Sequence, residues 1–274
     1  MDNRELTDII ADISEAGFGY IILRDIPKQQ VQIDTIITPV KGGFRGFQFV
    51  PAGPHYISVK GYRGESYSFW TYLHANEAVV KVLDPDREAL IDDTLENTEH
   101  YTNLAKSGEM ASALMPYNLQ GFEVWNKLTN HISEAAFPLQ LHPIPDQVPN
   151  RFAYAFGEVH GGKEELFLAE FQLAFASWYI TQGKSGPPER WLHLLQAIYN
   201  AGEQKMADHP RLFSQLVDAL IGQFNFLQDA EFSEDSSLCY GADYLVEDLT
   251  DTEISDLVLK AKEFSDYLTA RINA

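Results

Sequence analysis

Eight histidines, one cysteine and a Gly-Lys-Ser tripeptide are the groups in this sequence that could bind a metal, attack a substrate or hold a phosphate. The histidines are scattered, and none has the His-x-x-x-His spacing that places two imidazoles on one helical face for zinc. His131 and Glu134 lie one helical turn apart, which suits a pair of metal ligands, but so short a pattern is frequent by chance. We therefore predict no metal site.

The other two groups lack the surroundings that their chemistry needs. Gly183-Lys184-Ser185 resembles the end of a phosphate-binding loop, but Trp178 stands where that loop needs its first glycine, and a helix precedes it instead of a strand. Cys239 lies among acidic residues, which disfavour the thiolate and make a poor nucleophile. The sequence therefore indicates no catalytic residue and no cofactor. An enzyme would need catalytic residues that converge from distant positions.

The stretch from Asp229 to Asp256 concentrates negative charge, with ten acidic residues and no lysine or arginine. Two interpretations stay open. The acids solvate a loop and the start of a helix, whose dipole favours negative charge there, or they form a docking surface for a basic partner. The residues that we single out for docking are Asp243, Glu247, Asp248, Asp251 and Glu253.

The whole chain of 274 residues is acidic as well, with 40 Asp+Glu against 20 Lys+Arg and a net charge of -20. Affinity for nucleic acids comes largely from lysine and arginine that displace counterions, so we expect no direct nucleic-acid partner. Anionic membranes are excluded as partners for the same reason. A basic protein surface is the partner that this charge favours.

A direct test of this expectation is RNA binding. The protein should show no micromolar or tighter affinity for single- or double-stranded RNA at physiological salt, because its field repels phosphates. Fluorescence anisotropy with labelled RNA measures this affinity. Binding at that salt would contradict the prediction.

Further features indicate an intracellular protein. A single cysteine allows no intrachain disulfide, which fits a reducing compartment. The charged N-terminus is no secretory signal, and no apolar run is long enough to span a membrane. The expected compartment is the cytoplasm, with the nucleus as the alternative in a eukaryote.

Residues 1–150 read as a β-rich N-terminal domain with flanking helices. Short alternating or apolar runs predict strands near residues 20–23, 45–50, 55–60, 66–73 and 78–83. The second and third are expected to form a hairpin about Pro51-Ala52-Gly53-Pro54. Helices are expected over 86–106, where Asp84-Pro85 supplies the start signal, and over 119–132. The predicted architecture is an antiparallel β-sandwich or open barrel.

Residues 151–274 read as an all-α bundle, which makes the whole fold α+β. Helices are expected from Glu164 to Gly183, from Pro187-Pro188, from His209-Pro210 and over Thr252–Ile272. Residues 152–156 are expected as a last strand or an extended segment. Four linker prolines mark the domain boundary, and the aromatic residues about them predict that the two domains pack as one rigid unit. These are Pro138, Pro143, Pro145 and Pro149.

Two separated motifs carry a resemblance to a known family. The first is Phe44-Arg45-Gly46 followed by Val50-Pro51-x-Gly53-x-His55-Tyr56, and the second is Trp125-x-x-Leu128-Thr129-Asn130-x-Ile132-Ser133-Glu134. In this order they resemble the signature of the AAR2 family of splicing factors, and Leu168–Phe175 resembles the start of that family's helical domain. We expect the motif residues to serve the fold, with Arg45 bonded to the turn and His55 packed in a strand. They are Phe44, Arg45, Gly46, Pro51, Gly53, His55, Trp125, Leu128, Thr129 and Ser133.

The resemblance implies a non-catalytic assembly factor of the U5 small nuclear ribonucleoprotein, with a VHS-like C-terminal bundle. The chain would be a short, divergent or non-eukaryotic member. The implied partner is the large U5 scaffold protein, contacted at its RNase H-like and Jab/MPN-like domains. The family's extended C-terminal tail is absent after Ala274, so we expect a weaker bridging role. The alternative is an enzyme or small-ligand-binding protein with a site in the interdomain cleft.

Overall fold

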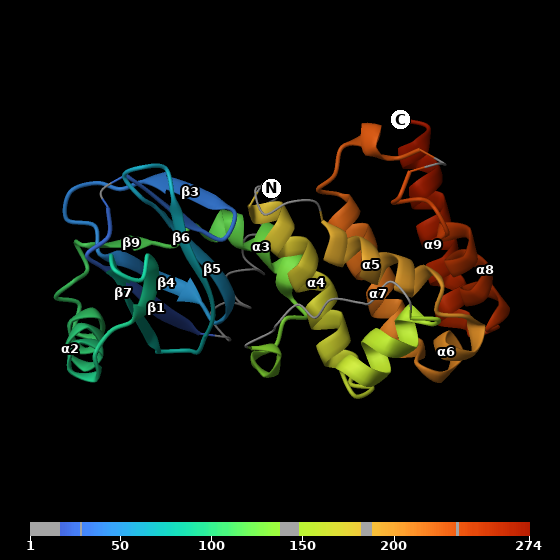
Figure 1. The fold of residues 1–274 in the computed structure, drawn as a ribbon, viewed down its shortest axis with the longest axis horizontal. Coiled ribbons are helices and arrows are strands. Elements are labelled where there is room, and N and C mark those ends of the chain that lie inside the picture. Colours follow the sequence, from blue (N-terminus) through green and yellow to red (C-terminus); the bar gives the residue numbers. More distant parts are fainter. Residues whose placement is uncertain (1–16, 28, 138–147, 182–187, 234–235) are drawn as a thin grey trace. The chain divides into compact units, whose positions relative to one another are not determined.

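The computed structural model describes residues 17–27, 29–137, 148–181, 188–233 and 236–274, and Figure 1 shows the fold. The chain divides into two compact units, Met1–Asn126 and Lys127–Ala274. The first contains two sheets and the second is helical, which confirms the α+β class. The domain boundary placed at residue 150 falls within the second unit and stays a prediction. The apolar spacing of Leu6, Ile9, Ile10 and Ile13 predicts an amphipathic helix at the start of the chain. That stretch, Pro138, Pro143 and Pro145 of the linker, and the loop at Gly183–Ser185 lie outside the described residues.

The strands of the first unit form two sheets. One has the order β8-β7-β1-β4-β9 and contains β1 (Phe18–Arg24), β4 (Gly46–Pro51), β7 (Ala78–Asp84), β8 (Ala89–Asp92) and β9 (Leu114–Pro116). The other has the order β3-β2-β5-β6 and contains β2 (Gln30–Ile33), β3 (Ile36–Pro39), β5 (Gly53–Lys60) and β6 (Ser66–Leu73). The second sheet is antiparallel as predicted. In the first sheet, β1 pairs with β7 and β4 pairs with β9 in parallel. Parallel strands need a long connection between them, and in both pairs several other elements lie between the two strands in the sequence.

The predicted hairpin about Pro51-Ala52-Gly53-Pro54 is wrong. β4 pairs with β1 and β9, whereas β5 pairs with β2 and β6, so the two consecutive strands lie in different sheets. The chain crosses from one sheet to the other at Ala52, and we call the stretch Pro51–Gly53 the sheet-crossing corner. Alternating side chains predict a strand but do not specify its partner, which explains the error.

The apolar core of this unit has two layers about β1. Ile21 and Leu23 belong to the cluster between the two sheets, and Ile22 belongs to a cluster on the opposite face. Helix α2 (Leu95–Lys106) contributes Ala105 to the second cluster. Since successive side chains of a strand point to opposite faces, both faces of β1 are buried, as its unbroken apolar run predicted.

The helix predicted over 86–106 begins later than expected. Residues Ala89–Asp92 form β8, and Leu90 joins the core between the sheets. Helix α2 is capped by Thr94, whose hydroxyl accepts a hydrogen bond from the Asn97 N–H. The start signal at Asp84-Pro85 therefore belongs to a turn, and the N-cap nearest the helical stretch determines where α2 begins.

The second unit is a bundle around α4 (Glu164–Ile180), which is apolar and buried on nearly all sides. Helix α7 (Pro210–Phe224) begins at a proline, as predicted, because the fixed φ of proline suits the first helical position. Helix α3 (Leu119–Thr129) begins in the first unit and ends in the second. The second unit also contains α5 (Glu189–Tyr199), α6 (Glu203–Asp208), α8 (Ala242–Asp251) and α9 (Ser255–Ile272).

Residues 152–156 are neither a strand nor extended, which corrects the expectation from the sequence. They lead into a π-helical segment, η2 (Ala153–Val159), and the Asn150 side chain accepts a hydrogen bond from the Ala153 N–H. The rings of Phe152 and Phe156 stack with centroids 5.3 Å apart in the helical core. These two rings, which we expected to fix the two domains to each other, are thus core residues of the helical unit itself. The rigid docking of the domains stays a prediction.

Candidate functional site

The acidic stretch contains a helix that the sequence did not reveal. Helix α8 buries Ala242, Leu245 and Leu249, which repeat at helical spacing. Gly241 precedes it with a φ of 85°, a conformation that glycine adopts without steric cost. The sequence did not reveal α8 because only a few apolar residues occur at helical spacing within this acidic stretch.

Three of the five predicted docking residues share one face of α8. Asp243, Glu247 and Asp251 are exposed at four-residue spacing, and we call these three the acidic face. Asp248 is half-buried and accepts a hydrogen bond from a backbone N–H of α6; burial, followed by the charges of Glu247 and Asp251, raises its pKa. Glu253 lies in the turn after α8 with a φ of 55°. The structure therefore does not bring Asp248 and Glu253 onto the acidic face.

A groove of about 390 Å³ adjoins the acidic face between α8 and α9. Tyr240 and Tyr244 are 66% and 56% exposed, before and within α8. Exposed tyrosine rings attract lysine and arginine side chains through their π faces. The groove is lined by Cys239, Ala242, Asp243, Val246, Ser265, Leu268, Thr269 and Ile272.

Within the part of the chain that the structure describes, no ion pair joins a lysine or arginine to the acidic face. Lys260 of α9 pairs with Asp218 and Glu263, and Arg271 of α9 pairs with Asp229. All three of these acids lie outside the acidic face. The combination of these carboxylates, the exposed tyrosines and a groove whose mixed lining includes Val246, Leu268 and Ile272 suits a basic peptide segment that carries an apolar anchor.

A buried network in the first unit resembles a catalytic pair but has a different role. The His55 Nδ1 atom lies 2.9 Å from Asp34 Oδ2, and its Nε2 atom lies 2.7 Å from the Pro51 carbonyl oxygen. The Tyr117 hydroxyl donates to Asp34 Oδ2 at 2.6 Å. A carboxylate and a carbonyl can only accept, so both ring nitrogens donate and the imidazole is charged.

The electrostatics of His55 agree with this assignment. Burial alone lowers the pKa of His55, but the charge of Asp34 and the hydrogen bonds to Asp34 and Pro51 outweigh burial and raise that pKa. The side chains of His55 and Asp34 are fully buried, and neither ring nitrogen is free to move a proton to a substrate. The network therefore holds the sheet-crossing corner in place, and His55 lies buried within β5.

A second buried charge cluster crosslinks the helical unit. The His160 Nε2 atom lies 2.5 Å from Glu170 Oε2, and Arg190 Nε donates to Glu170 Oε1 at 2.8 Å. Burial raises the pKa of the Glu170 carboxyl, but His160 and Arg190 outweigh burial and lower it. The cluster joins α4 to α5 and to the end of η2. The sequence analysis missed this cluster. The signal that could have revealed it is Glu170, a carboxylate in the middle of the apolar stretch Leu166–Phe175.

Most of the motif residues serve the fold. A side chain at Gly46, whose φ is 141°, would come within 2.0 Å of the Ile21 carbonyl oxygen, so glycine allows β4 to approach β1. Phe44 packs edge-on against Phe47 in the core between the sheets, and Gly53 starts β5.

The second motif is also anchored in the fold. Trp125 Nε1 donates a hydrogen bond to the Pro54 carbonyl at 2.7 Å. The buried residues of the second motif include Trp125, Leu128 and Thr129, and the buried Ser133 hydroxyl has no hydrogen-bond partner among the described residues.

Arg45 does not behave as predicted. Its side chain is exposed and forms no hydrogen bond with the turn. Its backbone N–H donates to the Ala113 carbonyl, and its own carbonyl accepts from the Leu23 N–H. The reason is positional: Arg45 precedes β4, and the corner lies at the other end of that strand.

The described residues contain no group of three or more His, Cys, Asp and Glu side chains arranged to hold a metal ion. His131 is half-buried, and burial lowers its pKa. Within the same described ranges, every helix is too short or too polar to cross a membrane.

Comparison with known protein families matches both parts of the chain. The AAR2 N-terminal domain matches residues 17–138, and the AAR2 C-terminal repeat region matches residues 150–273. A search of curated proteins finds no match. Both motifs lie within the first match, Leu168–Phe175 lies within the second, and together the two matches cover most of the sequence. The chain therefore belongs to the AAR2 family.

Proposed function

We propose that this protein is a non-catalytic, protein-binding assembly factor of the U5 small nuclear ribonucleoprotein. The observation that carries the proposal is that both parts of the AAR2 architecture occur in order within one chain. The family's members hold the largest U5 scaffold protein, contact its RNase H-like and Jab/MPN-like domains, and delay the loading of a helicase. We assign the same partner to this chain and place its action in the cytoplasm.

The acidic face and the adjoining groove support a protein partner and indicate its chemistry. Asp243, Glu247 and Asp251 present three carboxylates at a regular spacing, and the groove beside them has both polar and apolar lining residues. Such a surface favours a basic segment, because opposite charges speed encounter and select partners. The two buried histidine–carboxylate clusters support a non-catalytic role, since their groups are engaged within the fold.

Binding of the full chain to purified scaffold fragments tests the proposal. The RNase H-like and Jab/MPN-like domains of the U5 scaffold, titrated by calorimetry, should bind with dissociation constants of about 10 μM or lower. The helicase should compete with the complex in a pull-down. If neither fragment binds at about 100 μM, the proposed function is wrong.

Charge reversal on the acidic face should weaken this binding. The variant Asp243→Lys/Glu247→Lys/Asp251→Lys is expected to lose about tenfold or more in affinity, mainly through slower association, because opposite charges steer the encounter. The effect should shrink at high salt, where surface charges are screened. Surface plasmon resonance at two salt concentrations measures both rates.

A matched control separates a local effect from the change in net charge. Glu96→Lys/Glu99→Lys/Glu109→Lys makes the same change of six charges on exposed residues in or near α2. This control should bind like the wild type. Equal losses in both triple variants would show that net charge matters and that the acidic face is not the docking surface.

A further inference from the structure

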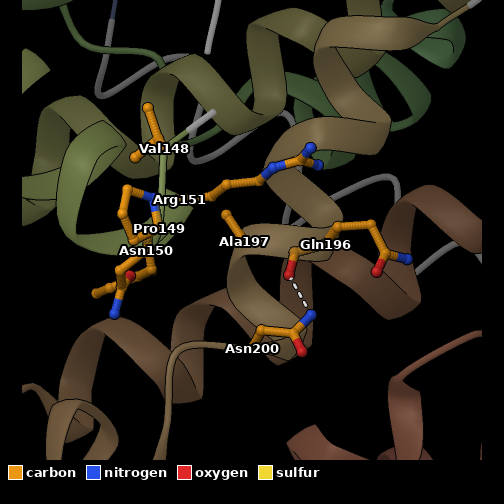
Figure 2. Close-up of a pocket in the computed structure, with 8 residues that line it drawn as sticks. Val148, Pro149, Asn150, Arg151, Gln196, Ala197 and Asn200 are labelled. Atoms are coloured by element: carbon orange, nitrogen blue, oxygen red, sulfur yellow. Dashed lines mark hydrogen bonds between the residues drawn. The ribbon is translucent and has the colours of Figure 1, made fainter. Parts of the chain in front are cut away.

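A pocket of about 330 Å³ lies between the residues that lead into η2 and helix α5, and Figure 2 shows its lining. The amide side chains of this lining are engaged within the helical unit. Asn150 accepts from the Ala153 N–H, and Asn200 donates to the Gln196 carbonyl, drawn as the dashed line in Figure 2. Gln196 in turn donates to two carbonyls just before α8. These amides cap and join segments of the helical unit, so we assign no ligand to this pocket.

Phe49 of β4 has a backbone conformation that its side chain disfavours. Its φ is 56°, in the left-handed region, where a bulky residue is a genuine outlier. In the described part of the chain, the other non-glycine residues with a positive φ are aspartate, asparagine or glutamate. A side chain held in this region costs free energy, and the surrounding structure must keep it there. Such strain often marks a residue with a function.

A β-bulge explains the positive φ but not the phenylalanine. Gly19 pairs with Val50 and Ile21 pairs with Phe47, so one residue of β1 faces two residues of β4, one of which is Phe49. Because of the extra residue, Phe47 and Val50 both belong to the core between the sheets, although strict alternation would place them on opposite faces. Where a bulge uses the left-handed region, glycine usually occupies that position. The fold therefore requires the bulge, and a smaller residue would serve it with less strain.

The ring of Phe49 lies on an uncharged part of the surface. It is 52% exposed and packs edge-on against half-buried Phe18, with the ring centroids 6.4 Å apart. Half-buried Tyr20 of β1 and Gln48 of β4 are its neighbours in the bulge, and exposed Pro116 of β9 lies opposite Gln48. We call these five residues the neutral patch. Although 22% of the chain is charged, none of the five is, and aromatic residues without charge are typical of the centre of a protein interface.

We propose that the neutral patch is a second protein-docking surface and that Phe49 is its anchor, which inserts into an apolar pocket of the partner. The bulge turns the ring toward water, and burial in a partner would remove that apolar surface from water. Aromatic anchors of this kind carry much of the affinity of protein interfaces. The net charge of -20 keeps copies of this chain apart, so we assign a different protein as the occupant. That occupant is the scaffold protein assigned above, so this inference rests on the proposed function.

Asparagine at position 49 separates a role in binding from a role in the fold. Asparagine tolerates the left-handed region, so Phe49→Asn should keep or raise the denaturant midpoint of the β-rich unit, followed by circular dichroism. The same variant should lose about tenfold or more in affinity for the RNase H-like or the Jab/MPN-like fragment of the scaffold, because the anchor is removed. Surface plasmon resonance with the full chain measures this affinity.

Tyr62→Asn is the matched control. Tyr62 is an aromatic residue of the same unit, 71% exposed in the turn between β5 and β6, and its φ is not positive. This variant removes an exposed aromatic ring from the end of the sheets opposite to Phe49 and should bind like the wild type. Equal losses in both variants would show that no particular aromatic residue is the anchor, and they would overturn the proposal.

The possible outcomes separate this inference from the proposed function. If the wild type binds neither scaffold fragment, the proposed function is wrong and the partner assigned here is wrong with it. If the wild type binds and folded Phe49→Asn binds equally well, the proposed function stands and the anchor is overturned. A clear fall in the midpoint of Phe49→Asn also overturns the anchor, because the ring then serves the fold. Sedimentation should show a monomer, and a dimer that Phe49→Asn dissociates would make a second copy the occupant and overturn the assignment.

Discussion

Replacing Asp34 with asparagine should destabilise the N-terminal unit by about 3–5 kcal/mol, the usual loss when one partner of a buried ion pair is removed. The carboxylate of Asp34 accepts from His55, from Tyr117 and from the Tyr56 N–H, and its side chain is fully buried. Asparagine keeps the shape but turns one acceptor into a donor and removes the counter-charge of the imidazolium. Hydrogen exchange of the β5 amides in the full chain measures the loss.

The pH dependence gives this variant a signature that ordinary destabilisation lacks. The folded pKa of His55 is raised, so its ion pair contributes in full below the unfolded value of about 6.5. That contribution decreases as the pH rises through the folded pKa. The wild-type free energy of unfolding should therefore fall as the pH rises above about 6.5, and Asp34→Asn should lose this slope.

Tyr117→Phe is the matched control for the charge. It removes one hydrogen bond to the Asp34 carboxylate, at an expected cost of about 1.5–3 kcal/mol, and leaves the ion pair intact. This variant should keep the alkaline slope. A slope that persists in Asp34→Asn would show that the pH dependence does not come from the His55–Asp34 ion pair.

Gly46→Ala should cost about 4 kcal/mol, the second large effect that we expect. About half comes from holding a side chain at a φ of 141°, which non-glycine residues avoid. The rest comes from the clash, because the added Cβ atom would lie 2.0 Å from the Ile21 carbonyl oxygen and would push β4 away from β1. The denaturant midpoint of the β-rich unit, followed by circular dichroism, measures the loss.

Gly53→Ala isolates the clash from the backbone strain. Gly53 has a similar φ of 134°, but an added Cβ atom meets nothing within 4 Å. This variant should therefore cost only the strain, about 2 kcal/mol. If the two alanine variants are equally stable, the close approach of β4 to β1 is not what requires Gly46.

The sequence by itself determined the class of each half of the chain and the family. The apolar run at Ile21 to Leu23 predicted a strand buried on both faces, and it is one. Pro210 marked the start of α7, because its fixed φ and missing N–H are tolerated only in the first turn of a helix. Such features are local, since they depend on side-chain periodicity and on the dihedral angles of single residues.

The tertiary structure alone decided which distant residues meet. Local periodicity makes Gly46–Pro51 and Gly53–Lys60 strands, but only packing assigns them to different sheets, since a strand pairs wherever its apolar face can be buried. Phe152 starts a helix because its ring is buried against other aromatic rings that lie far along the chain. His55 meets Asp34, and His160 meets Glu170 and through it Arg190, by contacts that no spacing rule predicts. Buried charges and pockets arise from these long-range contacts, because burial is a property of the folded chain and not of the residue.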